Sequence, residues 1–290
     1  MALSERLEQM ILQFQENEIT EYHIYSNLAR RTRDPENNRI LQHIAEDEHR
    51  HYGEWKEQTG KEVPANQFKV WWYTLLGRLL GITFALKLME RGEEGAQDAY
   101  GELVTEVPVA KAILADEDAH EEALLGMLDE ERLRYTGSIV LGLNDALVEL
   151  TGALAGLTLA LQNTTLIALT ASITGIAASM SMAASEYLST KAEETSKTPG
   201  RAALYTGLAY VFTVLVLVLP YLLFDNLYLC LGLSLLIGVL IIASFTYYIS
   251  VAEDQPFRRR FLEMAGLSLS IAALSFGIGY LIRELFGVEV

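Results

Sequence analysis

Residues 142–157 read GLNDALVELTGALAGL, an apolar stretch whose only charged residues are Asp145 and Glu149. The stretch belongs to the first of five apolar segments in the second half of the chain, and each segment has the roughly 20 residues that a helix needs to cross a bilayer. These segments are residues 138–161, 164–189, 203–224, 227–249 and 263–286. Their spacing predicts a five-helix transmembrane domain at residues 135–290.

The charge of the chain is concentrated before these segments. Residues 1–134 contain 27 Asp and Glu against 15 Lys and Arg, whereas residues 135–290 contain 11 against 7. All five histidines also lie in the acidic part. This balance argues against nucleic acid as a partner, because binding to phosphates needs clustered Lys and Arg. Metal cations are better candidates, and the single Cys230 provides neither a disulfide nor a cysteine-rich metal site.

The acidic part has the spacing of amphipathic helices. Residues 3–32 and 36–59 form two of them, and further helical stretches cover residues 68–106 and 109–135. No strand-like alternation is present, so we predict an all-α chain in which residues 1–134 form a four-helix bundle. The N-terminal sequence MALSERLEQM lacks the basic region and apolar core of a signal peptide, and we therefore expect the bundle in the cytosol.

Residues 70–90 are apolar enough to suggest a sixth span. Arg78 and Lys87 lie within them, and charged residues are costly inside a bilayer. We therefore expect a crossover segment followed by a bundle helix. Its aromatic residues either touch the membrane interface or pack on the bundle, and the sequence favours neither arrangement. These residues are Trp71, Trp72 and Tyr73, with Val70 beside them.

A repeated pattern of carboxylates and histidines runs through the predicted bundle. Each Glu-x-x-His places a carboxylate and an imidazole on one helix face, and each follows a Glu-x-x-Glu by about the length of one helix. The predicted members are Glu18 and Glu21 before Glu46 and His49, and Glu90 and Glu93 before Glu117 and His120. Two such pairs are typical of two-metal sites in bundle cores, so we predict two metal ions with one histidine each. We expect the remaining histidines, His23, His43 and His51, at the surface or behind the ligands.

Over roughly residues 5–131 this pattern resembles rubrerythrin and the wider ferritin-like family. The resemblance implies a di-iron site with these ligands: Glu18, Glu46, His49, Glu90, Glu93, Glu117 and His120. The rubredoxin-like cysteine-rich segment is missing, which puts a rubrerythrin-type peroxidase cycle in doubt.

The first two apolar segments carry polar groups that lipid does not explain. Asp145 and Glu149 lie on one face of the first, while Met180, Met182 and Glu186 lie near the end of the second. Carboxylates within spans usually face a pathway or a partner, and thioethers can bind soft transition ions. We therefore predict that these five residues line a transport pathway. Small residues in TGALAG and TGIAAS permit close contact within a protomer or across a homodimer.

The stretches GLNDALVELTGALAGL and SMAASEYLSTKAEE resemble the vacuolar iron transporter family, and with the acidic domain the whole chain resembles membrane-bound ferritin-like proteins. The resemblance implies an iron exporter for detoxification in a prokaryotic cell membrane. The positive-inside rule predicts a cytosolic N-terminus and an external C-terminus. Two alternatives remain: a membrane-tethered ferroxidase or peroxide-consuming di-iron enzyme, and a manganese transporter, because oxygen-rich sites separate iron from manganese poorly.

Overall fold

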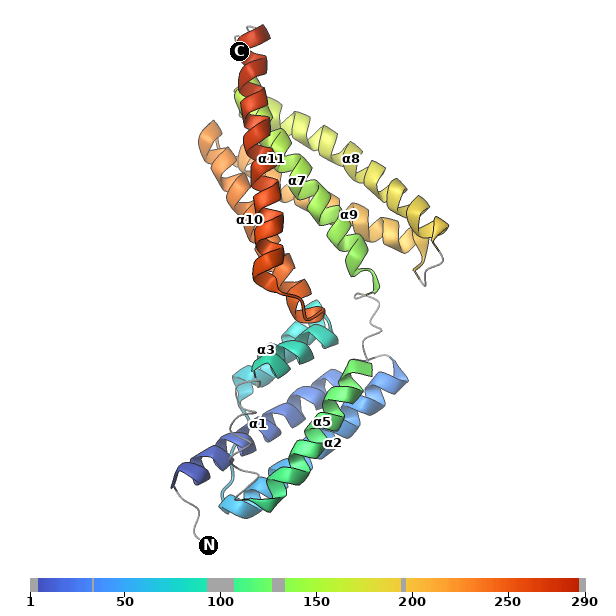
Figure 1. The fold of residues 1–290 in the computed structure, drawn as a ribbon, viewed down its shortest axis with the longest axis vertical. Coiled ribbons are helices and arrows are strands. Elements are labelled where there is room, and N and C mark those ends of the chain that lie inside the picture. Colours follow the sequence, from blue (N-terminus) through green and yellow to red (C-terminus); the bar gives the residue numbers. More distant parts are fainter. Residues whose placement is uncertain (1–4, 33, 93–106, 127–133, 194–196, 287–290) are drawn as a thin grey trace. The chain divides into compact units, whose positions relative to one another are not determined.

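The computed structural model describes residues 5–32, 34–92, 107–126, 134–193 and 197–286. Within these ranges every regular element is a helix, which confirms the predicted all-α class. The chain divides into two compact units, residues 1–130 and 131–290. Both units are helical (Figure 1).

Unit 1 contains four helices with defined bounds and a further helical segment at residues 82–92. The helices are α1 (Glu5–Ala29), α2 (Pro35–Thr59), α3 (Gln67–Leu80) and α5 (Pro108–Gly126). Asp34 caps α2 by accepting hydrogen bonds from the backbone N–H groups of Glu36 and Asn37, and Pro35 occupies the first turn. Gly60 ends α2 with a φ of 66°, a left-handed conformation that glycine adopts without strain.

The third predicted helix is interrupted. Gly81, with a φ of 107°, separates α3 from the helical residues 82–92, within the stretch where the sequence predicts a crossover segment followed by a bundle helix. No backbone position with this φ suits an ordinary side chain, so the helix cannot continue through it. Residues 93–106 lie outside the described part of the chain.

Two apolar clusters pack the helices of unit 1. One joins the first half of α1 to the end of α2 and the start of α5, through residues that include Phe14, Trp55 and Ile113. The other joins the second half of α1 to the middle of α2 and to α3, and includes Ile24, Ile44 and others. Along α1, α2 and α5 a short polar layer lies between these two clusters. Because both sides of this layer are apolar, most of its side chains, including Glu18, Glu48 and His51, are buried.

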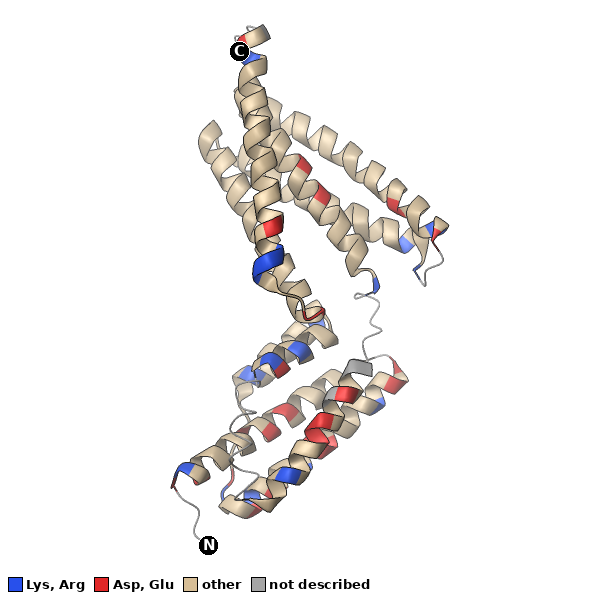
Figure 2. Cartoon of the chain, viewed as in Figure 1, with Lys and Arg blue, Asp and Glu red and all other residues tan. Residues whose placement is uncertain are grey.

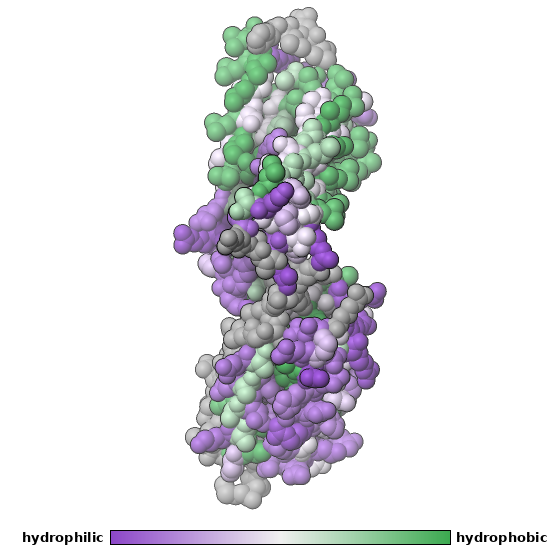
Figure 3. All heavy atoms as spheres, turned by 90° about the vertical axis from the view of Figure 1, so that its right-hand side faces the viewer, coloured by the Kyte–Doolittle hydropathy of each residue, from purple (hydrophilic) through white to green (hydrophobic). Residues whose placement is uncertain are grey.

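Unit 2 consists of five long apolar helices. They are α7 (Thr136–Leu161), α8 (Thr164–Ala192), α9 (Pro199–Leu223), α10 (Leu227–Ala252) and α11 (Phe257–Phe286). All five are long and apolar enough to cross a membrane, as the sequence predicted. Figure 3 shows one face of this unit, on which many exposed residues are hydrophobic, as expected for helices that face lipid. The chain is an integral membrane protein.

Glycines on α7 bring the spanning helices close together. A Cβ at Gly142 would overlap the carbonyl oxygen of Thr206 on α9. At the other end of α7, a Cβ at Gly279 of α11 would overlap the carbonyl oxygen of Gly156. Small residues permit this backbone approach, which is how helices gain packing energy in lipid. Consequently α7 is held between α9 and α11, with its polar residues at fixed positions.

Candidate metal centre and membrane carboxylates

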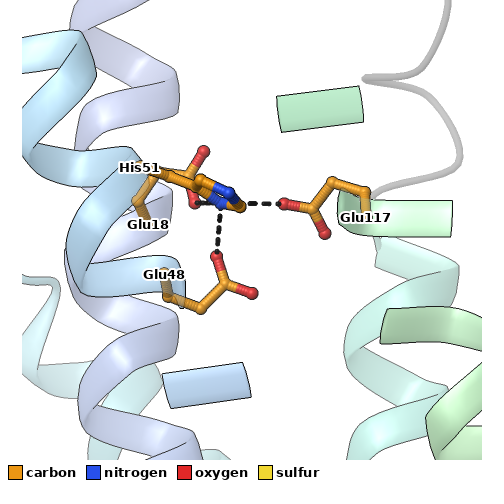
Figure 4. Close-up of side chains that lie close together, drawn as sticks. All are labelled: Glu18, Glu48, His51 and Glu117. Atoms are coloured by element: carbon orange, nitrogen blue, oxygen red, sulfur yellow. Dashed lines mark ion pairs between the residues drawn. The ribbon is translucent and has the colours of Figure 1, made fainter. Parts of the chain in front are cut away.

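Four possible metal ligands converge in the polar layer of unit 1 (Figure 4). Glu18 comes from α1, Glu48 and His51 from α2, and Glu117 from α5. One donor atom from each lies within 4.8 Å of all the others. Three helices therefore supply three carboxylates and an imidazole to one small volume.

A second histidine extends this cluster. His51 Nδ1 lies 3.6 Å from Glu48 Oε2 and 3.7 Å from Glu117 Oε1, and His120 Nδ1 lies 3.3 Å from Glu48 Oε1 and 3.8 Å from Glu117 Oε2. Each of the two carboxylates thus turns one oxygen toward each imidazole. Glu18 Oε2 lies 3.6 Å from His51 Nδ1. The arrangement defines two neighbouring positions that share Glu48 and Glu117, which is how carboxylates bridge two metals in bundle cores.

Both imidazoles are oriented by aspartates behind them. His51 Nε2 lies 3.1 Å from Asp116 Oδ2, and His120 Nε2 lies 3.1 Å from Asp47 Oδ2. A carboxylate accepts a hydrogen bond from a nitrogen that bears a proton, so in its neutral, metal-binding form each ring keeps its N–H on Nε2 and turns the lone pair of Nδ1 toward the cluster. Metal-binding histidines are commonly fixed in this way.

Arg50 connects the two aspartates. Its Nη2 lies 2.6 Å from Asp47 Oδ1 and 2.9 Å from Asp116 Oδ2. Partial burial favours the neutral acids, but hydrogen bonds from Arg50 and the histidines outweigh it and lower the pKa of both aspartates. Asp47 and Asp116 therefore stay charged, and both favour the neutral histidine tautomer that carries its N–H on Nε2.

Within the described part of the chain, five buried atoms in the cluster have no hydrogen-bond partner: Glu18 Oε2, both carboxylate oxygens of Glu48, His51 Nδ1 and His120 Nδ1. Leaving such atoms without partners in a protein interior costs free energy. All five point into one volume, and together they offer carboxylate oxygens and imidazole nitrogens. This donor set fits a divalent transition ion.

The pKa values of the cluster residues reflect their burial and the short distances between the carboxylates and the histidines. Burial raises the pKa of Glu18 well above its usual value and also raises that of Glu48, with nearby carboxylates adding to both shifts. Burial disfavours the charged histidines too, but carboxylates outweigh it, so the pKa of His51 is raised and that of His120 rises to about 10. Without metal, protons supply the positive charge that the carboxylates require.

The structure brings together only part of the ligand set predicted from the sequence. Glu18, Glu117 and His120 lie in the cluster, whereas Glu46 and His49 lie on the exposed side of α2. Glu48 and His51 take their place, two residues further along. A step of two residues turns a side chain by about 200° around a helix, which moves it to the opposite face.

The expectation that His51 lies outside the ligand cluster is wrong, because its side chain is fully buried within it. His43 is exposed and His23 half-buried, outside the cluster. Glu90 is half-buried on the helical residues 82–92, and Glu93 lies outside the described residues. Glu21 is buried on α1, one turn beyond Glu18.

Three of the predicted pathway residues in unit 2 either lie on α7 or form a hydrogen bond with it. Asp145 and Glu149 lie one turn apart on α7, as the sequence predicted. Glu149 Oε2 accepts a hydrogen bond of 2.6 Å from the hydroxyl of Tyr210 on α9, and Glu186 Oε1 accepts one of 2.6 Å from Ser138 on α7. Red segments on α7 and α8 mark acidic residues (Figure 2), and the other charged residue of these two helices is Lys191 in the last turn of α8.

The two methionines differ in exposure. Met182 is half-buried and packs against the apolar core of unit 2, whereas the side chain of Met180 is 70% exposed. The sequence analysis did not single out Tyr210 or Ser138. Neither belongs to a motif, and only the fold brings them to the carboxylates.

The comparisons with known proteins concern this part of unit 2. Residues 136–198 match the model of the VIT family, and this match implies a membrane transporter of iron or manganese. No curated protein and no solved structure matches the chain. The matched range covers α7 and α8, and with them Asp145, Glu149, Met180, Met182 and Glu186. The chain is thus an integral membrane protein with a VIT family segment at residues 136–198.

Proposed function

We propose that the protein exports ferrous iron, which unit 1 collects at the carboxylate and histidine cluster and unit 2 carries across the membrane. One observation supports this function most strongly. A chain with a VIT family segment also contains five buried donor atoms that have no hydrogen-bond partner among the described residues and that converge on one volume outside that segment. A metal-binding layer of this kind has a clear use in a metal transporter, since it concentrates the ion near the membrane.

The proposed ligands are Glu18, Glu48, His51, Glu117 and His120. Glu48 and Glu117 bridge two ions, His51 and Glu18 complete one position, and His120 belongs to the other. Glu90 or Glu93 is proposed as the terminal carboxylate of the second position. Two ions with bridging carboxylates and one histidine each correspond to a ferritin-like, rubrerythrin-type site. The mixed oxygen and nitrogen ligands favour iron over calcium or magnesium.

In unit 2 we assign the pathway to one stripe of α7. Ser138, which binds Glu186, is followed by Asp145 about 10 Å further along the helix and by Glu149 about 6 Å beyond that, given a rise of about 1.5 Å per residue. Carboxylates at these intervals can pass a dication between them. Met180 and Met182 add thioethers on α8.

A homodimer is part of this proposal. Glu149 is exposed in the single chain although it lies within a spanning helix, and Met180 on α8 is exposed as well. A carboxylate that faces lipid is costly, so a second copy that covers this face would remove the cost.

The distribution of basic residues supports the proposed topology. The loops at residues 162–163 and 224–226 contain no Lys or Arg, whereas Lys197 follows α8, Arg201 lies in the first turn of α9 and the start of α11 contains three consecutive arginines. Basic residues favour the cytosolic side, which supports a cytosolic unit 1 and its proposed role as a collector for export.

A second function has one observation in its favour. The two metal positions share Glu48 and Glu117, and paired irons with shared carboxylates also occur in enzymes that react with oxygen or peroxide. In that case unit 1 would be a tethered ferroxidase or peroxidase.

Metal flux in proteoliposomes distinguishes these functions. We expect iron to move faster than manganese and Asp145→Asn to abolish flux while unit 1 still binds metal. Asp225→Asn, an exposed change in the loop between α9 and α10, is the matched control and should leave flux intact. Flux of neither ion with the wild-type protein, combined with metal-dependent oxygen or peroxide consumption, would favour the tethered enzyme. Preferential flux of manganese would make the protein a manganese transporter.

A further inference from the structure

Helix α3 has an apolar surface that unit 1 leaves exposed. The side chains of Phe68, Trp71 and Leu79 are 69%, 57% and 59% exposed, and Trp72 is exposed as well. Residues 68, 72, 75 and 79 follow one another at intervals of four, three and four, which places them on one face of the helix. Such a continuous stripe of large apolar side chains indicates a binding surface.

The opposite face of α3 is fixed to the rest of unit 1. Val70 belongs to the buried cluster that contains Leu28 of α1. Gly77 lies so close to Leu28 that a Cβ at position 77 would overlap its side chain. At the start of the helix, the backbone N–H of Asn66 donates a 2.9 Å hydrogen bond to the hydroxyl of Thr20. These contacts set the rotation of α3, so the exposed stripe is a defined surface of the folded unit.

The charge around this stripe is opposite to that of the unit as a whole. Residues 63–89 contain no Asp or Glu but include Lys69, Arg78 and Lys87, although residues 1–134 carry a large excess of acidic residues. Lys69 and Arg78 are exposed beside the stripe. Blue segments on α3 in Figure 2 contrast with the red segments of the other helices in unit 1. The surface therefore combines aromatic and basic groups, a composition that suits an anionic lipid surface.

The length of α3 decides how it can meet a bilayer. Its 14 residues extend about 21 Å, less than the roughly 30 Å of hydrocarbon that a spanning helix must cross. Trp side chains concentrate at the membrane interface, where the ring is partly in hydrocarbon and its N–H meets water. A helix of this size and composition lies in the plane of the interface.

The chain also keeps α3 within reach of the bilayer. Helix α5 ends at Gly126 and the first spanning helix begins at Thr136. Ten residue steps can extend about 35 Å at most. Unit 1 is therefore confined near the membrane, and contact between α3 and lipid is an intramolecular step with a high effective concentration.

We propose that the face of α3 formed by Phe68, Trp71, Trp72 and Leu79 inserts into the interface of an anionic lipid bilayer, with Lys69 and Arg78 at the headgroups. Unit 1 is then attached to the membrane at two places, by its connection to α7 and by α3. The second attachment restricts the rotation of unit 1 over the membrane. This inference depends on the membrane-spanning helices and not on the metal site or the direction of transport.

The test uses tryptophan fluorescence of the full chain in nanodiscs that hold one chain each, made from phosphatidylcholine with phosphatidylglycerol. The three tryptophans are Trp55, which is buried, and the exposed pair Trp71 and Trp72. Lipids brominated near the headgroup end of their acyl chains should quench the exposed pair and leave Trp55 emitting. The double change Trp71→Ser and Trp72→Ser should abolish most of this quenching.

A charge reversal provides a second variant that leaves the tryptophans in place. Lys69→Glu with Arg78→Glu should reduce the quenching in anionic discs, and Lys111→Glu, an exposed change on α5, should not. Three results would overturn the proposal. Quenching only in discs with two chains would assign the surface to a second copy. Protection from aqueous iodide without quenching by bromolipid would assign it to the chain's own spanning helices, and ready quenching by iodide would leave it in water.

Discussion

His51 Nε2 lies 3.1 Å from Asp116 Oδ2, so the N–H of this buried imidazole is directed away from the carboxylate cluster. When the ring is neutral, as metal binding requires, the lone pair of Nδ1 is thereby directed toward Glu18, Glu48 and Glu117. Asp116 on α5 thus determines that His51 on α2 would bind a metal ion through Nδ1. The first prediction follows from this relationship.

Asp116→Asn should weaken metal binding while leaving the ligands in place. The amide can donate to Nε2, which would move the ring proton to Nδ1 and block the ligand atom. Loss of such a partner typically lowers metal affinity by about 10- to 100-fold. Competition with a chromophoric chelator measures the change. Asp118→Asn, an exposed change two residues away, is the matched control, and equal affinities of the two variants would contradict the role of Asp116.

Glu48→Gln should abolish binding of two metal ions per chain, whereas Glu46→Gln should leave it unchanged. Glu48 has both oxygens buried in the cluster, and Glu46 is exposed on the opposite face of α2. In the presence of a chelator, the Glu48 variant should also be more stable to unfolding at neutral pH by about 1 kcal/mol, because burial and Glu117 raise the pKa of Glu48 on folding and glutamine carries no charge. Metal counts by elemental analysis and thermal unfolding provide the two measurements. Loss of both metals in the Glu46 variant would restore the ligand set predicted from the sequence.

Metal binding should release protons and strengthen as the pH rises. Without metal, the raised pKa values of Glu18 and Glu48 and the pKa of about 10 for His120 keep protons in the cluster. A metal needs charged carboxylates and neutral imidazoles, so it competes with these protons. Between pH 6.5 and 8 the affinity should rise by about tenfold per pH unit for each proton released.

Anaerobic calorimetry in two buffers with different ionisation enthalpies measures the number of protons. An apparent enthalpy that is independent of the buffer would refute the prediction. The same shift affects stability in the absence of metal. Because folding raises the pKa of His120, its stabilising contribution is present below pH 6.5 and is lost as the pH rises through about 10.

The proposed topology places Asp225 outside and Lys197 inside. Cysteines introduced at these two positions should react with a membrane-impermeant maleimide from opposite sides of intact cells or oriented vesicles. The native Cys230 is fully buried and should not interfere. Labelling of position 197 from outside and of position 225 from inside would reverse the topology and turn the proposed exporter into an importer.

Much of the fold could be predicted from composition and spacing. The five spans are long apolar runs, and their predicted ranges agree closely with the helices because polar loops and caps such as Asn163 and Asn226 separate them. A crossover segment followed by a bundle helix was expected around residues 70–90, but the position of the break at Gly81 was not predicted, because nothing in the neighbouring residues distinguishes this glycine from one that a helix tolerates.

The register of the metal cluster was harder to predict than its composition. The run EDEHRH at residues 46–51 contains two Glu-x-x-His pairs, and spacing alone does not choose between them. The apolar face of α2 does choose. Leu41, Ile44 and Trp55 are buried, and Glu48 and His51 continue their periodicity, whereas Glu46 does not.

A longer sequence repeat also favours Glu48 and His51 over Glu46 and His49. Residues 47–51 and 116–120 both read Asp-Glu-x-x-His, and in each the aspartate binds the histidine of the other copy. The cross-pairing itself could not be predicted, because it depends on how α2 and α5 lie beside each other. The same is true of Tyr210 and Glu149, which belong to different spanning helices.

The central claim is that unit 1 collects iron for the transporter, and the dependence of flux on free ferrous iron tests it most directly. Transport would be compared in proteoliposomes with unit 1 on the outer face, for the wild type, Glu48→Gln and Glu46→Gln. We predict that Glu48→Gln lowers flux only at low free iron and reaches the wild-type rate at saturation, while Glu46→Gln follows the wild type throughout. Identical curves for all three proteins would contradict the claim, because iron would then enter the membrane pathway without passing through the cluster.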